Sequence, residues 1–227
     1  MTASATSPDY SLLRKLAAEF IGSALLLATV VGSGVMGERL AGGNAAIALL
    51  ANSIATGAAL FALIAMFAPI SGAHFNPVVT LIEVWSGRMN RRHAAIYLAA
   101  QFVGAVLGVV LAHAMFEIAL VQSSQHQRTG VAQWVSEFVA TFGLLTVILH
   151  ADKSRSTTVA AMVAAYITAA YWFTASTSFA NPAVTLARSL TDTFSGIRLT
   201  DVPMFILAQM LGAAAAYFLH RWMTREH

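Results

Sequence analysis

The chain has 227 residues, of which 58% are hydrophobic and only 10% are charged, and its mean hydropathy is +0.70. A soluble domain normally carries about 25% charged residues, so this composition indicates a protein that is dissolved in lipid. The net charge of +3 is too small to favour a nucleic-acid partner, and the absence of cysteine excludes disulfides, thiolate metal sites and cysteine nucleophiles.

Several apolar segments are long enough to cross a bilayer, which takes about 20 predominantly apolar residues. Arg14 and Lys15 precede the first run, but it continues to about Met36 and is too long for the core of a signal peptide. The sequence therefore predicts an all-α membrane protein with six transmembrane helices. The predicted spans cover residues 12–36, 45–68, 94–118, 131–150, 156–175 and 202–222.

Two further apolar stretches, residues 76–86 and 181–190, are too short to cross. Ten residues of helix rise only about 15 Å, which is half of a hydrocarbon core about 30 Å thick. Each stretch begins with Asn-Pro, and these residue types are favoured at the N-cap and at the first position of a helix. We therefore expect two re-entrant half-helices that begin inside the membrane, at Asn76-Pro77 and at Asn181-Pro182.

The chain contains an internal repeat, because three short signatures occur twice in the same order and at nearly constant separation. Residues 18–22 correspond to 136–140, 76–81 to 181–186, and 100–104 to 208–212. Each half carries three spans, and since three is odd, the second half must insert upside down. The sequence thus predicts a single transmembrane domain over residues 1–227, with inverted repeats over about 10–120 and 128–224 and a ligand path at the midplane between them.

The basic residues of the loops predict the orientation, because cytoplasmic loops carry an excess of Lys and Arg. One side has fewer of them: Arg39, Arg128, Arg188 and Arg198. The richer side includes both termini, which are therefore predicted to be cytoplasmic. Its basic residues are Arg14, Lys15, Arg88, Arg91, Arg92, Lys153, Arg155, Arg221 and Arg225.

These features together resemble the aquaporin or major intrinsic protein family. The resemblance covers essentially the whole chain, and the paired Asn-Pro motifs at this repeat spacing are highly specific. It implies a passive channel, not an enzyme, that needs no cofactor and forms a homotetramer with one pore per subunit. The short termini and loops favour a bacterial inner membrane.

The two motifs predict how the pore treats ions and protons. A helix N-terminus carries about +0.5 of an elementary charge, so two such ends that meet at the midplane repel cations. Asn76 and Asn181 are expected to cap their helices and to direct remaining amide N–H groups at a passing water or alcohol, which interrupts proton hopping. The alternative is that both asparagines are only caps. The residues predicted at the midplane are Asn76, Asn181, Pro77, Pro182, Val78 and Ala183.

Glu19 and Glu137 stand within apolar helices, where a carboxylate needs partners. The resemblance implies a structural role, in which they accept hydrogen bonds that hold the re-entrant loops; a proton relay is the alternative. Gln101 and Gln209 are expected to join neighbouring helices.

The chain departs from the family where the outer selectivity filter is expected. Counted without gaps from the two asparagines, the filter positions are Thr56, Ala169, Ser178 and Val184, and Val184 stands where relatives usually have arginine. None of the four is aromatic or charged, which predicts a wide constriction that passes glycerol, urea or undissociated arsenous acid as well as water. Bacterial relatives in arsenic-resistance settings look similar. The alternatives are a water-selective aquaporin and, less favoured, an ion-coupled secondary transporter.

Two further side chains are candidates for the pore vestibule. Arg188 follows Val184 by one helical turn, so it shares that helix face; the alternative is an exposed loop arginine or one paired with Asp192. His74 is expected in the vestibule or in loop packing, and His113 between helices. No pair of histidines has the spacing of metal ligands, so no metal site is predicted.

Overall fold

The computed structural model describes residues 10–152 and 155–224, so Lys153 and Arg225, which support the predicted orientation, lie outside the described residues. Within them, six helices are long and apolar enough to cross a membrane, and the predicted fold class is confirmed. The helices are α1 (Leu12–Leu40), α2 (Ala45–Ser71), α3 (Pro77–Trp85), α4 (Arg91–Met115), α5 (Val131–His150), α6 (Ser156–Phe173), α7 (Pro182–Ala187) and α8 (Val202–Met223), with the 3-10 turns η1 (Arg188–Leu190) and η2 (Leu199–Asp201).

Several helix ends differ from the predicted ones for local reasons. The third span begins at Arg91 because the side chain of Asn90 caps it, accepting a hydrogen bond from the backbone N–H of His93 (2.9 Å). The second span continues to Ser71 and ends at Gly72, whose φ of 91° only glycine adopts readily. The second half-helix is regular only over α7, after which the chain tightens into η1.

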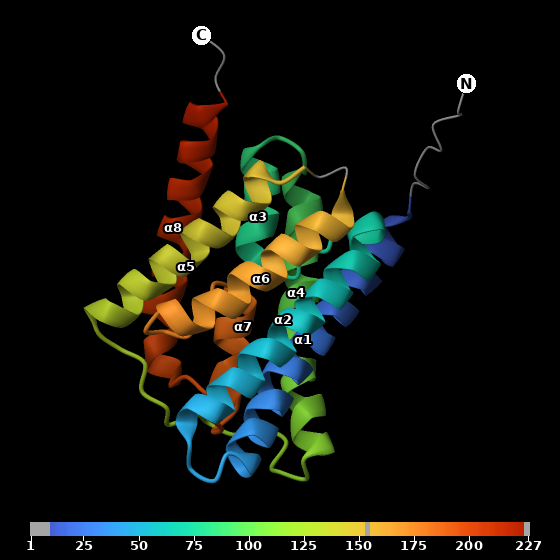
Figure 1. Cartoon of the computed structure of the whole chain (residues 1–227). Helices are drawn as coiled ribbons and strands as arrows, with labels where there is room; N and C mark the ends of the chain where they lie inside the picture. The colour runs from blue at the N-terminus through green and yellow to red at the C-terminus, as the bar shows by residue number, and fades with distance from the viewer. Residues whose placement is uncertain (1–9, 153–154, 225–227) are drawn as a thin grey trace.

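The spans form two groups of three, one from each half of the chain. Helix α1 packs against α2 and α4, α5 packs against α6 and α8, and the groups meet where α2 packs against α6. Figure 1 shows that the beginning of α1 and the end of α8 lie at the same end of the molecule. This arrangement agrees with an even number of spans.

The half-helices occupy the space between the two groups. Helix α3 lies in the half of the molecule where α1 begins, and α7 lies in the opposite half (Figure 1). Each contacts a long helix of its own group and one of the other: α3 packs against α4 and α8, and α7 packs against α8 and α4. The half-helices also contact one another, so their N-terminal ends meet inside the protein.

Glycines let the long helices of each group approach closely. A Cβ atom at Gly104 of α4 would clash with the backbone carbonyl of Phe20 in α1, and one at Gly212 of α8 would clash with that of Phe138 in α5. These two contacts occupy corresponding places in the two repeats. Close backbone packing at small residues is the usual way in which helices associate in lipid, where burial of apolar surface contributes little.

We predict that Gly104→Ala destabilises the protein by about 1–3 kcal/mol, because a backbone carbonyl cannot move aside as a side chain can. The measurement is the unfolding temperature in detergent. Gly32→Ala in α1 is the matched control, since its new Cβ would meet only the Phe116 side chain, at 3.2 Å. Equal unfolding temperatures for the two variants would contradict the prediction.

Candidate functional site

The first re-entrant loop is held by one buried carboxylate. Glu19 accepts hydrogen bonds from the Ser71 hydroxyl (2.7 Å), from the backbone N–H groups of His74 (2.9 Å) and Phe75 (2.8 Å), and from the Gln101 amide (2.8 Å). Its side chain is fully buried. Four donors converge on the two oxygen atoms, which lets a carboxylate remain inside an apolar helix bundle.

The second loop is held in the same way. Glu137, also fully buried, accepts hydrogen bonds from the backbone N–H groups of Phe179 (2.9 Å) and Ala180 (2.9 Å) and from the Gln209 amide (2.6 Å). Both glutamates are therefore saturated by donors of their own half. In each half the glutamine also donates to a threonine of the half-helix: Gln101 to Thr80 (2.9 Å) and Gln209 to Thr185 (2.8 Å).

The loop backbones adopt the left-handed conformation at corresponding residues. Ala73 and Phe75 have φ values of 48° each, and Ser178 and Ala180 have φ values of 52° and 49°. Such angles cost a residue with a side chain about 1–2 kcal/mol. They turn successive N–H groups toward the glutamate. In the described part of the chain no hydrogen bond reaches the carbonyls of Ala73, Ser178 or Phe179, and all three residues line the cavity described below.

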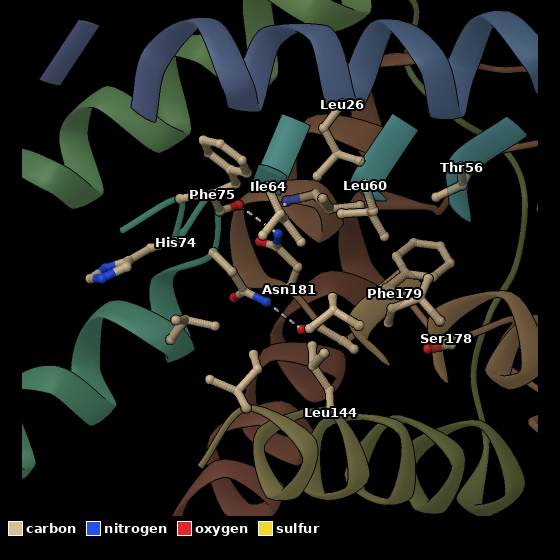
Figure 2. A pocket seen from close by; sticks show the side chains of 18 of the residues that line it. Leu26, Thr56, Leu60, Ile64, His74, Phe75, Leu144, Ser178, Phe179 and Asn181 are labelled. Carbon is tan, nitrogen blue, oxygen red and sulfur yellow. Dashed lines mark hydrogen bonds between the residues drawn. The ribbon is translucent and has the colours of Figure 1, made fainter. Parts of the chain in front are cut away.

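The two asparagines bind the halves together at the midplane. Asn76 caps α3 by accepting from the N–H of Val78 (3.1 Å), and its amide donates to the carbonyl of Ala180 in the other half (2.8 Å). Asn181 caps α7 by accepting from the N–H of Ala183 (2.9 Å), and its amide donates to the carbonyl of Phe75 (2.8 Å). Figure 2 shows bonds of this kind as dashed lines beside the cavity. Each amide also has a second N–H group, and both asparagines line the cavity described below.

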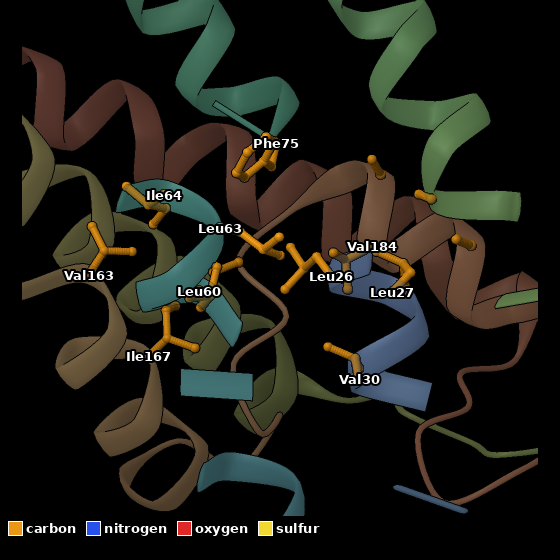
Figure 3. Packing of buried hydrophobic residues seen from close by; sticks show 14 of the residues in the cluster. Leu26, Leu27, Val30, Leu60, Leu63, Ile64, Phe75, Val163, Ile167 and Val184 are labelled. Carbon is orange, nitrogen blue, oxygen red and sulfur yellow. The ribbon is translucent and has the colours of Figure 1, made fainter. Parts of the chain in front are cut away.

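A cavity of about 110 Å³ passes between the loops. His74 lies at one end, Asn181 near the middle, and Thr56, Ser178 and Phe179 at the other end (Figure 2). Its walls are mostly apolar, and Figure 3 shows how leucine, isoleucine and valine side chains of α2 and α6 approach one another there. Apolar lining residues include Leu26, Leu60, Ile64, Leu144, Val163 and Ile167.

The structure places most of the predicted pore residues on this cavity. Asn76, Asn181, Thr56, Ser178, Val184, His74 and Arg188 line it. Pro77 and Pro182 are the first residues of α3 and α7, and Val78 and Ala183 are buried behind the asparagines without being part of the lining. The cavity thus brings together residues from both repeats.

The prediction that Ala169 belongs to the filter is wrong, because Ala169 does not line the cavity. Its side chain is exposed on the outside of α6, and the residues of α6 at this end of the cavity are Ile167 and Tyr171. The prediction counted residues back from Asn181 across the extended loop that follows α6. The count arrives at Ala169, two residues before Tyr171, which is the residue that lines the cavity. Two residues are about 200° of helix rotation, so the count lands on the opposite face.

Arg188 is neither an exposed loop arginine nor paired with Asp192. Only 2% of it is exposed, its Nε donates to the Ser195 carbonyl, and its guanidinium lies over the ring of Phe179, 3.4 Å from the ring centre. Asp192 instead accepts from the backbone N–H of Gln125 (2.8 Å). Arg188 therefore brings a buried positive charge to the end of the cavity formed by Thr56, Ser178 and Phe179, which we call the outer end, and a cation–π contact stabilises it there.

Arg128, which the sequence marks only as a loop residue, lies at the same place. It donates to the carbonyls of Gly196 (2.7 Å) and Ser176 (3.3 Å), and its guanidinium is 5.1 Å from the centre of the Phe179 ring. Burial lowers the pKa of the Arg128 guanidinium, and the nearby Glu137 carboxylate opposes this shift. No local motif distinguishes this arginine from an exposed one, because its partners come from distant segments.

His113 and His74 both hydrogen-bond to other residues of the protein. His113 is fully buried, and its ring nitrogens hydrogen-bond to loop residues, 2.7 Å from the Thr191 hydroxyl and 2.9 Å from the Leu120 carbonyl. His74 lies on the cavity, 3.0 Å from the Thr80 hydroxyl. Within residues 10–152 and 155–224, no group of three His, Asp or Glu side chains could hold a metal ion.

Comparison with known proteins agrees with this geometry. The family model described as Major intrinsic protein matches residues 6–174 and 152–227, which together span nearly the whole chain. The chain belongs to the major intrinsic protein family. Members of this family are membrane channels and not enzymes, so the chain is an integral membrane channel with six spans.

Individual members of the major intrinsic protein family are similar over almost the full length. Aquaglyceroporin AqpS of Rhizobium meliloti (strain 1021) is 53% identical over 96% of this chain and 93% of its own. Probable aquaporin AqpM of Archaeoglobus fulgidus is 30% identical over 95% of this chain and 99% of its own. The X-ray structure of the aquaglyceroporin from Plasmodium falciparum superposes with a TM-score of 0.74, covering 94% of this chain and 98% of that one; at 20% identity this likeness supports the fold alone.

We predict that Glu137→Gln lowers the yield of folded protein and its unfolding temperature. The new amide places an NH₂ group among three donors, and each buried donor left without an acceptor costs about 1–3 kcal/mol. Size-exclusion chromatography and thermal unfolding in detergent measure the effect. Glu38→Gln, at an exposed position near the end of α1, is the matched control and should behave as the wild type. Wild-type stability of Glu137→Gln would show that the carboxylate does not hold the loop.

Proposed function

We propose that this chain is a passive channel of the aquaglyceroporin type, which conducts small uncharged solutes such as glycerol, urea or undissociated arsenous acid together with water and excludes ions and protons. One observation carries the proposal: a mostly apolar cavity passes two midplane asparagines and reaches an outer end where Val184 stands in the place of arginine. The similarity to Aquaglyceroporin AqpS supports the same solute class.

Exclusion of cations and protons rests on the half-helices. The N-termini of α3 and α7 meet near the midplane, and each contributes about +0.5 of an elementary charge. Asn76 and Asn181 each use one amide N–H to bind the opposite loop. The second N–H of each amide is offered to the oxygen of a passing solute, which then cannot relay a proton along the file.

The breadth of the pore rests on its outer end. An arginine at position 184 would bring five N–H donors and a full charge into the bore, whereas valine brings neither. Arg188 supplies a positive charge one turn further along, but its guanidinium is stacked on Phe179 and held by the Ser195 carbonyl. A solute with a carbon skeleton therefore meets an apolar wall at Val184.

A water-selective aquaporin is the second candidate. The observation that favours it is that Tyr171 and Arg188, two large side chains, both line the outer end of the cavity. An ion-coupled transporter is less favoured, because it needs a titratable or ion-binding group at the midplane. The two membrane-embedded acids, Glu19 and Glu137, are instead saturated by hydrogen bonds to the loops.

We further propose that the channel works as a homotetramer in a bacterial inner membrane with both termini in the cytoplasm. The basic residues of the loops support this orientation. The outer surface of the helices carries many exposed large apolar side chains, which suit contact with lipid or with other subunits. Each subunit has its own cavity, so one pore per subunit follows.

The test is stopped-flow light scattering of proteoliposomes under gradients of sucrose, glycerol and arsenous acid in turn. Glycerol or arsenous acid entry well above that of protein-free vesicles, linear in concentration and independent of sodium or proton gradients, supports the proposal. Fast water flux without solute entry would favour the water-selective channel, and saturable, ion-dependent uptake would favour the transporter.

We predict that Val184→Arg slows glycerol entry at least about tenfold while water flow persists. The guanidinium fills the bore and leaves space for water but not for a three-carbon solute, and a barrier increase of 1.4 kcal/mol already gives that factor. The ratio of glycerol to water permeability in the same vesicles is the measurement, with Val184→Ile as the uncharged control. An unchanged ratio in Val184→Arg would mean that residue 184 does not border the narrowest part of the pore.

A further inference from the structure

Two histidines from different helices meet at the end of the molecule where α1 begins and α8 ends (Figure 1). His150 is the last residue of α5, and His220 lies in the last turn of α8. The centres of their rings are 4.9 Å apart, and the ring planes meet at 81°. Because α5 and α8 pack against each other, the fold itself brings the two rings together. The spacing of histidines in the sequence does not reveal this pair, since it joins distant segments.

The distance between the rings matches that of two imidazoles bound to one metal ion. A bond from Zn²⁺ to a histidine nitrogen is about 2.0–2.1 Å long, so the centre of a bound ring lies about 3.2 Å from the ion. Two such rings at an angle of about 90–110° at the ion have centres about 4.5–5.2 Å apart. The observed 4.9 Å falls within this range. The two helices therefore need not move to place both rings on one ion.

His150 is held in the form that binds metal ions. Its Nδ1 lies 2.9 Å from the backbone carbonyl of Thr146. A carbonyl oxygen only accepts, so Nδ1 carries the hydrogen and the lone pair is on Nε2. Histidine ligands of metal ions almost always donate their other ring nitrogen in this way. The side chain is exposed, so an ion can reach it from solution.

The ends of both helices also favour a cation. The C-terminus of a helix carries about −0.5 of an elementary charge, and the effect is confined to the last turn. His150 and His220 each lie in the last turn of their helix, and the two ends are neighbours. The negative ends of α5 and α8 therefore act together on an ion between the rings.

We propose that His150 and His220 form a binding site for a divalent transition-metal ion such as Zn²⁺, Ni²⁺ or Cu²⁺. Imidazole suits these ions, whereas Mg²⁺ and Ca²⁺ prefer oxygen ligands. Within the described residues no third His, Asp or Glu completes the group, so water takes the remaining coordination positions. Neither histidine lines the cavity, so the site is distinct from the proposed solute path and goes beyond the proposed function.

The bound ion acts on more than the two helix ends. Tyr217, one turn before His220 in α8, donates to the carbonyl of Trp85 (2.7 Å), which is the last residue of the half-helix α3. The two aromatic rings are also in contact, with their centres 5.8 Å apart. An ion that fixes the end of α8 against α5 therefore also secures the end of α3. We expect it to stabilise the folded protein.

Thermal unfolding of the purified full chain, without a polyhistidine tag, tests the proposal. Excess Zn²⁺ should raise the unfolding temperature by about 2–4 °C, because the ion binds the folded state, and EDTA should reverse the shift. Mg²⁺ should have no effect. His150→Asn and His220→Asn should each abolish the shift. Calorimetric titration should show one Zn²⁺ per wild-type chain and binding at least about tenfold weaker in either variant, since loss of an outer-shell partner alone costs that much.

His93→Asn is the matched control. His93 is an exposed histidine near the start of α4, and its Nδ1 lies 3.2 Å from the amide nitrogen of Asn90, so its replacement should leave the Zn²⁺ shift unchanged. Unfolding temperatures without metal report whether each variant is folded, and His150→Asn, at an exposed position, should match the wild type. A wild type that Zn²⁺ does not stabilise would overturn the site. So would a shift that persists in folded His150→Asn or disappears in His93→Asn.

Discussion

The structure depends on hydrogen bonds between two buried carboxylates and the backbone of two loops. Inside a bilayer a non-helical loop has no water to satisfy its N–H groups, so it persists only where the protein supplies acceptors. Glu19 and Glu137 supply them, and a charged acceptor roughly doubles the strength of each bond. The left-handed residues of each loop let successive N–H groups reach the same glutamate, and the carbonyls of Phe75 and Ala180 accept from the two asparagines.

The same loops make the two halves of the chain interdependent. Each asparagine stabilises its own half-helix with the side-chain oxygen and the opposite loop with the side-chain nitrogen, so neither half-helix is positioned by its own repeat alone. The packing of α3 against α8 and of α7 against α4 also joins each half-helix to the other half of the chain. A disturbance of one loop must therefore reach the other through the midplane. The repeated signatures include the glutamate, asparagine and glutamine positions because the side chains there make the hydrogen bonds that hold the loops and join the two halves.

The sequence predicts what local patterns determine. Helix length, the Asn-Pro starts and the repeat suffice for the six spans, the half-helices and the midplane asparagines, because hydrophobic thickness and helix capping act on neighbouring residues. Which residue of α6 faces the cavity depends on the path of the loop between Phe173 and Asn181. Counting residues back from Asn181 ignores that path, so the count selects Ala169, whereas the structure has Tyr171 on the cavity. The burial of Arg188 likewise depends on Phe179 and Ser195, whose positions relative to it only the tertiary structure defines.

The displaced arginine separates two tasks that a single filter residue would combine. In this chain Val184 borders the bore without charge, while Arg188 and Arg128 lie around Phe179 at its edge. Charges in a medium of low dielectric act over several ångströms, so both guanidiniums still oppose a cation at the outer end, as the half-helix termini do at the midplane. Neither guanidinium needs to lie in the path of the solute to have this effect. In the proposed channel, exclusion by charge therefore does not require a narrow bore, and we expect the apolar side chains that line the cavity to govern the choice among uncharged solutes.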